Sequence, residues 1–193
     1  DQQTVINGIN QSSSDYDAPV NSNPSEIVGG IKKWYNENGK LHRTEKDANG
    51  QTLPSLIRPD GFKAWYQNGE RHRTEKDANG QTLPALIHPN GSEWWQDGKV
   101  HRTDTDANGQ TLPAVIWSDR SKAWWQNGQR LRTDTDTNGQ TLPAVICSDG
   151  SKAWWQNGQR HRTDVVNGKL QPAVVDKDSN KQYWINRQKL EYE

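Results

Sequence analysis

Residues 122–146 read KAWWQNGQRLRTDTDTNGQTLPAVI, and close copies of this stretch fill most of the 193-residue chain. The stretch begins with two predicted strands joined by Asn127-Gly128, because Asn-Gly is the preferred pair of a two-residue type I′ hairpin turn. A third strand is predicted over TLPAVI, whose Pro143 lies near the strand start, where a missing N–H does least harm. No part of the chain shows the 3.6-residue period of an amphipathic helix. The unit is therefore predicted to be all-β.

The aromatic pair of this stretch recurs about every thirty residues. The pairs are Trp34-Tyr35, Trp65-Tyr66, Trp94-Trp95, Trp124-Trp125, Trp154-Trp155 and Tyr183-Trp184, at steps of 31, 29, 30, 30 and 29 residues. A fixed period of this length is the signature of a repeat array, whose terminal units act as caps. We expect an elongated tandem array of β-hairpin or meander repeats over residues 24–175. It has about five full units, a half unit that begins at Pro24, and a degenerate capping repeat over residues 176–193.

The composition fits a thin fold without a large aliphatic core. Leu, Ile, Val and Phe together number 30, a share typical of disordered chains, but the net charge is zero and there are ten Trp residues. Trp buries more area than any other side chain, so the indoles can replace the missing aliphatic core. Because the net charge is zero, the chain as a whole is not attracted electrostatically to nucleic acid. No apolar run is long enough to cross a bilayer. We expect neither a nucleic-acid partner nor a membrane span.

Each aromatic pair is predicted to place one ring on each side of a sheet, because adjacent residues of a strand face opposite ways. One ring can enter a core between neighbouring units. The other ring must be covered by a partner or stay exposed, and that second ring is a candidate for function.

Residues 1–23 read DQQTVINGINQSSSDYDAPVNSN and match no repeat unit. Their Ser, Asn, Gln and Asp content suggests a flexible leader. TVINGI could instead form a short strand that adds to the sheet edge of a neighbouring molecule, so self-association through this tail is a second interpretation. We read Asp1 as a processed start, which is compatible with a signal peptide that has been removed.

The units DGSKAWWQNGQRHRTD (149–164) and LPAVI (142–146) resemble a tandem repeat of the form W-Y-x-N-G-x-x-H-R-x-D-G-P-A-x-I. That repeat occurs in uncharacterised proteins of large DNA viruses, phages and bacteria, and is similar to the short β-hairpins of MORN-type repeats. The resemblance covers residues 24 to about 175 and implies a hairpin array, but no established activity. The chain departs from the pattern where the compact DGPA is replaced by DTDANGQTLPA, residues 104–114.

This insertion has the spacing of a calcium loop. An EF-hand type loop supplies oxygen ligands as D-x-[DN]-x-[DN]-G from positions 1, 3 and 5, and a backbone carbonyl from position 7. The candidate ligands are Glu45, Asp47, Asn49 and Gln51 in the first unit, Glu75, Asp77, Asn79 and Gln81 in the second, Asp104, Asp106, Asn108 and Gln110 in the third, and Asp134, Asp136, Asn138 and Gln140 in the fourth. The pattern predicts Ca²⁺ sites that stiffen the chain between units.

Two observations weigh on this prediction in opposite directions. Val115 stands where the bidentate Glu of position 12 is expected, so a further ligand must come from elsewhere. The loop of the fifth unit, TDVVNGKLQP, lacks both the carboxylate pattern and the additional residues of the other loops. Their joint loss suggests that the carboxylates and the longer loop serve one function. The alternative interpretation is a polar loop with an Asn-Gly turn, in which Asp side chains cap their own backbone.

The repeated His-Arg pairs do not indicate an enzyme. His42, His72, His101 and His161 form a row rather than a convergent metal site, and Leu131 replaces one member. The Arg that follows is constant among the units and can lie on an indole face while it binds a carboxylate. Catalysis needs one asymmetric pocket, whereas this chain offers the same residues several times. We expect a non-enzymatic protein.

Two functions fit these expectations. The first is a secreted, cell-surface or virion-surface structural protein that assembles into fibres or adheres, rigidified by Ca²⁺. The second is a multivalent, lectin-like protein whose exposed Trp95, Trp125 and Trp155, with Arg102, Arg132 and Arg162, bind glycans. They differ in whether one Trp row stays free or is buried against a partner.

Overall fold

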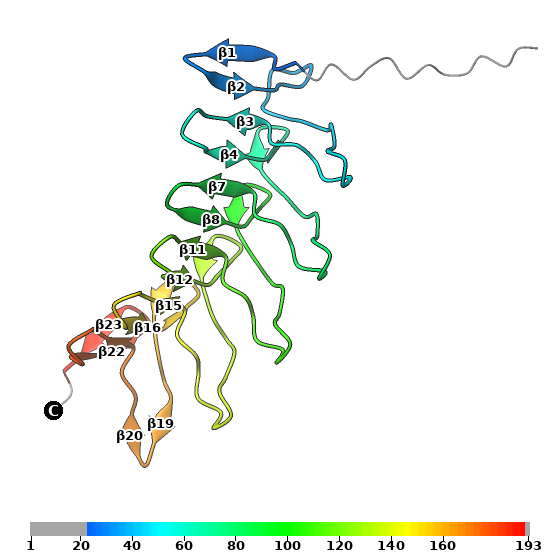
Figure 1. Cartoon of the computed structure of the whole chain (residues 1–193). Helices are drawn as coiled ribbons and strands as arrows, with labels where there is room; N and C mark the ends of the chain where they lie inside the picture. The colour runs from blue at the N-terminus through cyan, green and yellow to red at the C-terminus, as the bar shows by residue number, and fades with distance from the viewer. Residues whose placement is uncertain (1–22, 192–193) are drawn as a thin grey trace, which may run out of the picture.

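The computed structural model describes residues 23–191, and within this range every regular element is a β-strand (Figure 1). Thirteen short strands form one long antiparallel sheet. In sheet order they are β1 (Glu26–Val28), β2 (Ile31–Lys33), β3 (Leu56–Ile57), β4 (Lys63–Ala64), β7 (Leu86–His88), β8 (Gly91–Glu93), β11 (Val115–Trp117), β12 (Lys122–Ala123), β15 (Val145–Ile146), β16 (Lys152–Ala153), β21 (Val174–Val175), β22 (Lys181–Ile185) and β23 (Gln188–Leu190). The predicted all-β array with a thirty-residue period is confirmed.

Each interior unit also has a second, separate hairpin built around the Asn-Gly or Asp-Gly turn. These hairpins are β5 (Tyr66–Gln67) with β6 (Glu70–Arg71), β9 (Trp95–Gln96) with β10 (Lys99–Val100), β13 (Trp125–Gln126) with β14 (Gln129–Arg130), and β17 (Trp155–Gln156) with β18 (Gln159–Arg160). Asn127 and Gly128 have φ angles of 49° and 78°, and positive φ at both central residues is the mark of the predicted type I′ turn.

The unit differs in one respect from the predicted three strands. Lys122–Ala123 (β12) belongs to the long sheet, whereas Trp125–Gln126 (β13) belongs to the second hairpin, and Trp124 between them lies in neither strand. Of TLPAVI only Val145–Ile146 (β15) is strand, since the N–H of Leu142 bonds the carbonyl of Asp134 within the inserted loop.

The core is a column that follows the stacked units and is made mostly of Trp and Ala side chains. Ala123 and Ala144 are fully buried, and Trp124 is 6% exposed. The backbone N–H of Trp124 donates to the carbonyl of Ala144, beyond the inserted loop of the same unit, at 2.9 Å. Alanine lets neighbouring backbones approach, and the indole fills the remaining space, as the composition predicted.

The hairpins of the long sheet stack one after another from β1–β2 to β22–β23, and the inserted loops project from one side of the stack (Figure 1). The fifth loop contains the short strands β19 (Val165–Val166) and β20 (Lys169–Leu170). Among residues 23–191 no helix is present that could cross a membrane. The predicted leader or strand-donating tail, residues 1–23, lies outside the described residues except for Asn23.

Candidate functional site

The inserted loops are narrow hairpins, each tied by a single β-bridge between two residues that flank its tip. The bridges are Lys46–Thr52, Lys76–Thr82, Thr105–Thr111 and Thr135–Thr141. At the tip of the third loop the N–H of Asp106 donates to the carbonyl of Gln110 at 2.8 Å, and the N–H of Gly109 donates to the carbonyl of Asp106 at 3.0 Å. The backbone carbonyl predicted to bind calcium at position 7 therefore already accepts a hydrogen bond.

The second carboxylate of each loop caps its own turn. Oδ1 of Asp106 accepts the N–H groups of Asn108 and Gln110 at 2.8 and 3.0 Å. Asp47, Asp77 and Asp136 make the same pair of bonds in their loops. This is the arrangement that the alternative interpretation, a self-capped polar turn, predicts.

The first carboxylate of each loop instead reaches the preceding unit. Oδ2 of Asp104 accepts the N–H of Thr82 at 2.9 Å, Oδ1 accepts the Thr82 hydroxyl at 2.9 Å, and the Arg102 guanidinium donates to Oδ2 at 2.9 Å. The matching contacts are Glu75 with Thr52, Asp134 with Thr111, and Asp164 with Thr141. The fifth loop, which has lost the calcium pattern, keeps this contact.

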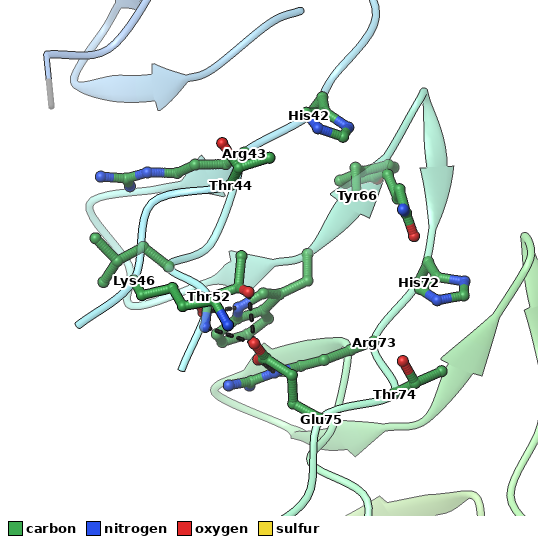
Figure 2. Close-up of a pocket in the computed structure, with 13 residues that line it drawn as sticks. His42, Arg43, Thr44, Lys46, Thr52, Tyr66, His72, Arg73, Thr74 and Glu75 are labelled. Carbon is green, nitrogen blue, oxygen red and sulfur yellow. Dashed lines mark hydrogen bonds and ion pairs between the residues drawn. The ribbon is translucent and has the colours of Figure 1, made fainter. Parts of the chain in front are cut away.

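An arginine and a tryptophan complete the contact. Arg102 donates from Nη1 to the carbonyl of Pro113 at 3.2 Å, and its guanidinium carbon lies 4.0 Å from the centre of the Trp94 ring. Trp94 Nε1 in turn donates to the carbonyl of Thr82 at 2.6 Å. We call this set of carboxylate, threonine, arginine and tryptophan the inter-unit clasp. Figure 2 shows the first one, with Glu75 beside Thr52 and Arg73.

Trp34 has no such partner. Its buried Nε1 lacks an acceptor among residues 23–191, whereas Trp65, Trp94, Trp124 and Trp154 each donate to a threonine carbonyl of the preceding loop. The indole hydrogen bond of the clasp therefore forms only where a full unit precedes the tryptophan.

Three of the four clasps, those of Glu75, Asp104 and Asp164, hold their carboxylates ionised. Burial alone would raise the pKa of Asp104, but hydrogen bonds from Arg102 and Thr82 outweigh burial, so the pKa lies below the ordinary Asp value. The pKa values of Glu75 and Asp164 are lowered in the same way against the effect of burial, with Thr52 and Thr141 the leading hydrogen-bond donors. Each carboxylate is thus bound more strongly in its charged form.

The lowered pKa values predict loss of stability in acid. A carboxyl whose pKa is lower in the folded state contributes stability above its unfolded pKa, about 4, and loses that contribution as the pH falls through the folded value. We expect the melting temperature to be nearly constant from pH 7 to 5 and to fall steeply below about pH 4. The Asp104→Asn variant should lose less between pH 5 and 3 than the wild type. An equal loss in both would contradict the assignment.

The predicted calcium ligands are therefore brought into neighbouring loops but bind different groups. Asp104 bonds the preceding unit, Asp106 bonds its own turn, and the Gln110 side chain lies 3.5 Å from Arg132 Nη2 of the next unit. No group of three or more His, Cys, Asp or Glu able to hold a metal ion occurs within the part of the chain that the structure describes. Calcium binding stays a prediction, and an ion bound by both carboxylates would compete with the clasp.

The histidine row is structural. Nδ1 of His101 accepts the N–H of Asn127 in the turn of the next unit at 3.1 Å. His42, His72 and His161 accept the equivalent N–H of Asn68, Asp97 and Asn186 at 3.1 to 3.2 Å. Each histidine thus fastens the following hairpin turn, a contact that Leu131 cannot make.

No protein-family model matches the chain, and no curated protein is significantly similar to it. The resemblance to hairpin repeats of viral, phage and bacterial proteins stays an expectation.

The aromatic pairs form two rows, as predicted. The inner row, Trp34, Trp65, Trp94, Trp124 and Trp154, is 6 to 8% exposed. The outer row, Tyr35, Tyr66, Trp95, Trp125, Trp155 and Trp184, is half-buried. The predicted glycan-binding set is split between them, because Arg102, Arg132 and Arg162 stack on inner rings and not on Trp95, Trp125 or Trp155.

The arginines that contact the outer row are Arg71, Arg130 and Arg160, which the sequence analysis missed. Arg130 lies with its guanidinium carbon 5.0 Å from the ring centres of both Trp125 and Trp155. Arg160 lies 5.6 Å from Trp155 and 5.3 Å from Trp184. The sequence does contain the information needed to predict this contact. A two-residue turn at 127–128 makes Trp125 and Arg130 direct cross-strand partners.

Proposed function

We propose that this chain is a non-enzymatic structural repeat protein that holds an extended shape at an exterior surface. The observation that supports this best is the repetition of the clasp at four junctions between consecutive units, through Thr52, Thr82, Thr111 and Thr141. The carboxylates and guanidinium groups of the clasps bond one another and the neighbouring unit. The groove of about 260 Å³ between the first two units is lined by Arg73 and Glu75, which already bond each other.

Self-association through the open sheet edge is part of this proposal. Among the described residues β1 pairs only with β2, and its Ile27 and Val28 are 60% and 59% exposed. Exposed apolar edge strands are ready to pair with another chain, and a head-to-tail contact of this kind generates fibres. The predicted role of the N-terminal tail as a donated strand would use the same edge.

Sedimentation velocity over a range of concentrations tests this proposal. The wild type should show a high frictional ratio and a weight-average mass that rises with concentration. The double variant Ile27→Lys/Val28→Lys should keep the frictional ratio and stay monomeric. The control Val165→Lys changes an apolar residue that is 61% exposed on a projecting loop, and it should associate like the wild type. A compact wild-type monomer at every concentration would overturn the proposal.

We also propose that the clasps stiffen the array without requiring a metal. Adding millimolar Ca²⁺ to the metal-stripped protein should then shift the melting temperature by less than about 2 °C relative to Mg²⁺, which is below 1 kcal/mol for a chain of this size. A larger, calcium-specific rise would contradict metal independence. It would instead support Asp104, Asp106 and their equivalents as the predicted ligands.

Glycan binding is a second candidate function, supported by the outer row in the last units. We call Trp125, Arg130, Trp155, Arg160 and Trp184 the Arg–Trp ladder. All five are half-buried, so each keeps part of its surface open to solvent. Indole faces beside hydrogen-bond donors are suited to sugars, whose C–H faces pack on rings while the hydroxyls bond at the edges.

A further inference from the structure

The two arginines of the Arg–Trp ladder are positive charges without a counter-ion. The side chains of Arg130 and Arg160 make no ion pair and donate no hydrogen bond within residues 23–191. In contrast, Arg43, Arg73, Arg102, Arg132 and Arg162 each bond a carboxylate and a proline carbonyl. Arg130 and Arg160 thus differ from these five arginines, whose side-chain donors bond acceptors within the chain.

The ladder also leaves indole donors without acceptors, and the sequence explains why. The buried Nε1 atoms of Trp125 and Trp155 have no hydrogen-bond partner in the described part of the chain. Trp95 Nε1 donates to Glu93 at 2.7 Å and Trp184 Nε1 donates to Gln182 at 3.1 Å, each two residues earlier. The residues two before Trp125 and Trp155 are Ala123 and Ala153, which offer no side-chain acceptor.

The same difference separates Arg71 from the ladder arginines. Arg71 Nε donates to the Tyr66 hydroxyl at 3.1 Å, whereas the buried Nε atoms of Arg130 and Arg160 lie beside Trp rings and have no acceptor among residues 23–191. Units four and five therefore share a cluster of unused donors that the second unit lacks.

No carboxylate is among the groups that shift the pKa of Arg130. Burial lowers the pKa of Arg130, and the charge of Arg160 lowers it further, while only Cys147 acts in the opposite direction. The Cys147 thiol is half-buried, and burial followed by the charges of Asp149 and Asp119 raises its pKa, so it stays neutral at pH 7. The ladder thus has two guanidinium groups that pair with no carboxylate among residues 23–191, a combination that favours an anion.

We infer that the Arg–Trp ladder is a binding site for the anionic groups of an acidic saccharide, sulfate or carboxylate. The guanidinium groups of Arg130 and Arg160 would pair with the anions, and the open surfaces of Trp125, Trp155 and Trp184 would pack against the sugar rings. This inference rests on the proposed glycan-binding role of the outer row and adds the ligand's charge and the units that bind it.

Trp fluorescence titrations test the inference with heparin as the sulfated ligand, polygalacturonate as the carboxylated ligand and dextran as the neutral one. The test variant is Arg130→Val/Arg160→Val, a change the fold tolerates because Val100 holds the equivalent position in the third unit. The matched control is Arg71→Val, which removes an arginine from the same row outside the ladder. Circular dichroism melts check that each variant is folded.

We expect the wild type and Arg71→Val to bind heparin or polygalacturonate in a salt-dependent way, and the double variant to lose at least tenfold in affinity. Competition by millimolar inorganic sulfate would support the anion as the recognised group. Binding of dextran as strong as that of the acidic ligands, and unchanged in the double variant, would overturn the inference while supporting a neutral glycan site. Binding of none of the three would overturn both the inference and the second candidate function. An equal loss of affinity in the double variant and in Arg71→Val would show that binding depends only on the overall positive charge, and it would also overturn the inference.

Discussion

Replacing Arg132 by alanine is expected to lower the free energy of unfolding by about 3–5 kcal/mol, the range for removing one partner of a buried ion pair. Arg132 is 8% exposed, donates to Asp134 at 2.8 Å and to the Pro143 carbonyl at 3.2 Å, and lies 4.0 Å from the Trp124 ring centre. Its loss leaves Asp134 without its cation and the proline carbonyl without a donor. Urea denaturation followed by circular dichroism measures the change.

Arg58→Ala is the control for this experiment. Arg58 is exposed and stacks on Phe62 at 4.2 Å, so its removal should cost less than about 1 kcal/mol. If Arg132→Ala were no more damaging than Arg58→Ala, the clasp would not be what holds the units together.

Replacing Trp124 by alanine should be about as costly, roughly 3–5 kcal/mol, because it opens a large cavity in the core column. Trp124 is 6% exposed, and its Nε1 donates to the carbonyl of Thr111 in the preceding unit at 2.7 Å. In an array each unit contacts mainly its neighbours, so this change should weaken the junction between the third and fourth units most. Hydrogen exchange should show the largest loss of protection in residues 111–146.

Trp117→Ala is the matched control, since it also removes an indole. Trp117 is half-buried at a position that holds Arg58, His88 or Cys147 in other units, so packing there is not specific. We expect a loss below about 1.5 kcal/mol, in line with a partly exposed position. A similar loss for both indoles would mean that the inner row is not the core.

Much of the fold follows from local sequence. Asn127-Gly128 fixes a two-residue turn, and the Trp124-Trp125 alternation places one ring inside and one outside. The extent of the strands could not be read in the same way. TLPAVI has β propensity throughout, yet Leu142 is held by the inserted loop, and that contact depends on how the loop folds back.

The contacts of the clasp could not be predicted from the sequence, because they depend on how the units stack. Asp104 and Asp106 look alike in the pattern, and only the stacking of units brings Thr82, 22 residues earlier, to Asp104 while Asp106 turns to its own tip. The prediction that the outer rings pair with Arg102, Arg132 and Arg162 is wrong, because these arginines stack on the inner row. Hairpin register would have selected Arg130 instead, as the residue paired with Trp125.

The bond between the carboxylate of one unit and the threonine of the unit before it is the central contact between units. A double-mutant cycle on Thr111→Val and Asp134→Ala measures that bond directly. The Thr111 hydroxyl lies 2.6 Å from Asp134 Oδ1. We predict a coupling energy of about 1.5–3 kcal/mol, as for a hydrogen bond to a charged group. The pair Thr137→Ala and Asp134→Ala is the control and should show no coupling, because Thr137 is exposed and Ala107 holds its position in the third unit. A Thr111–Asp134 coupling within error of the control would contradict the claim that these contacts join the units.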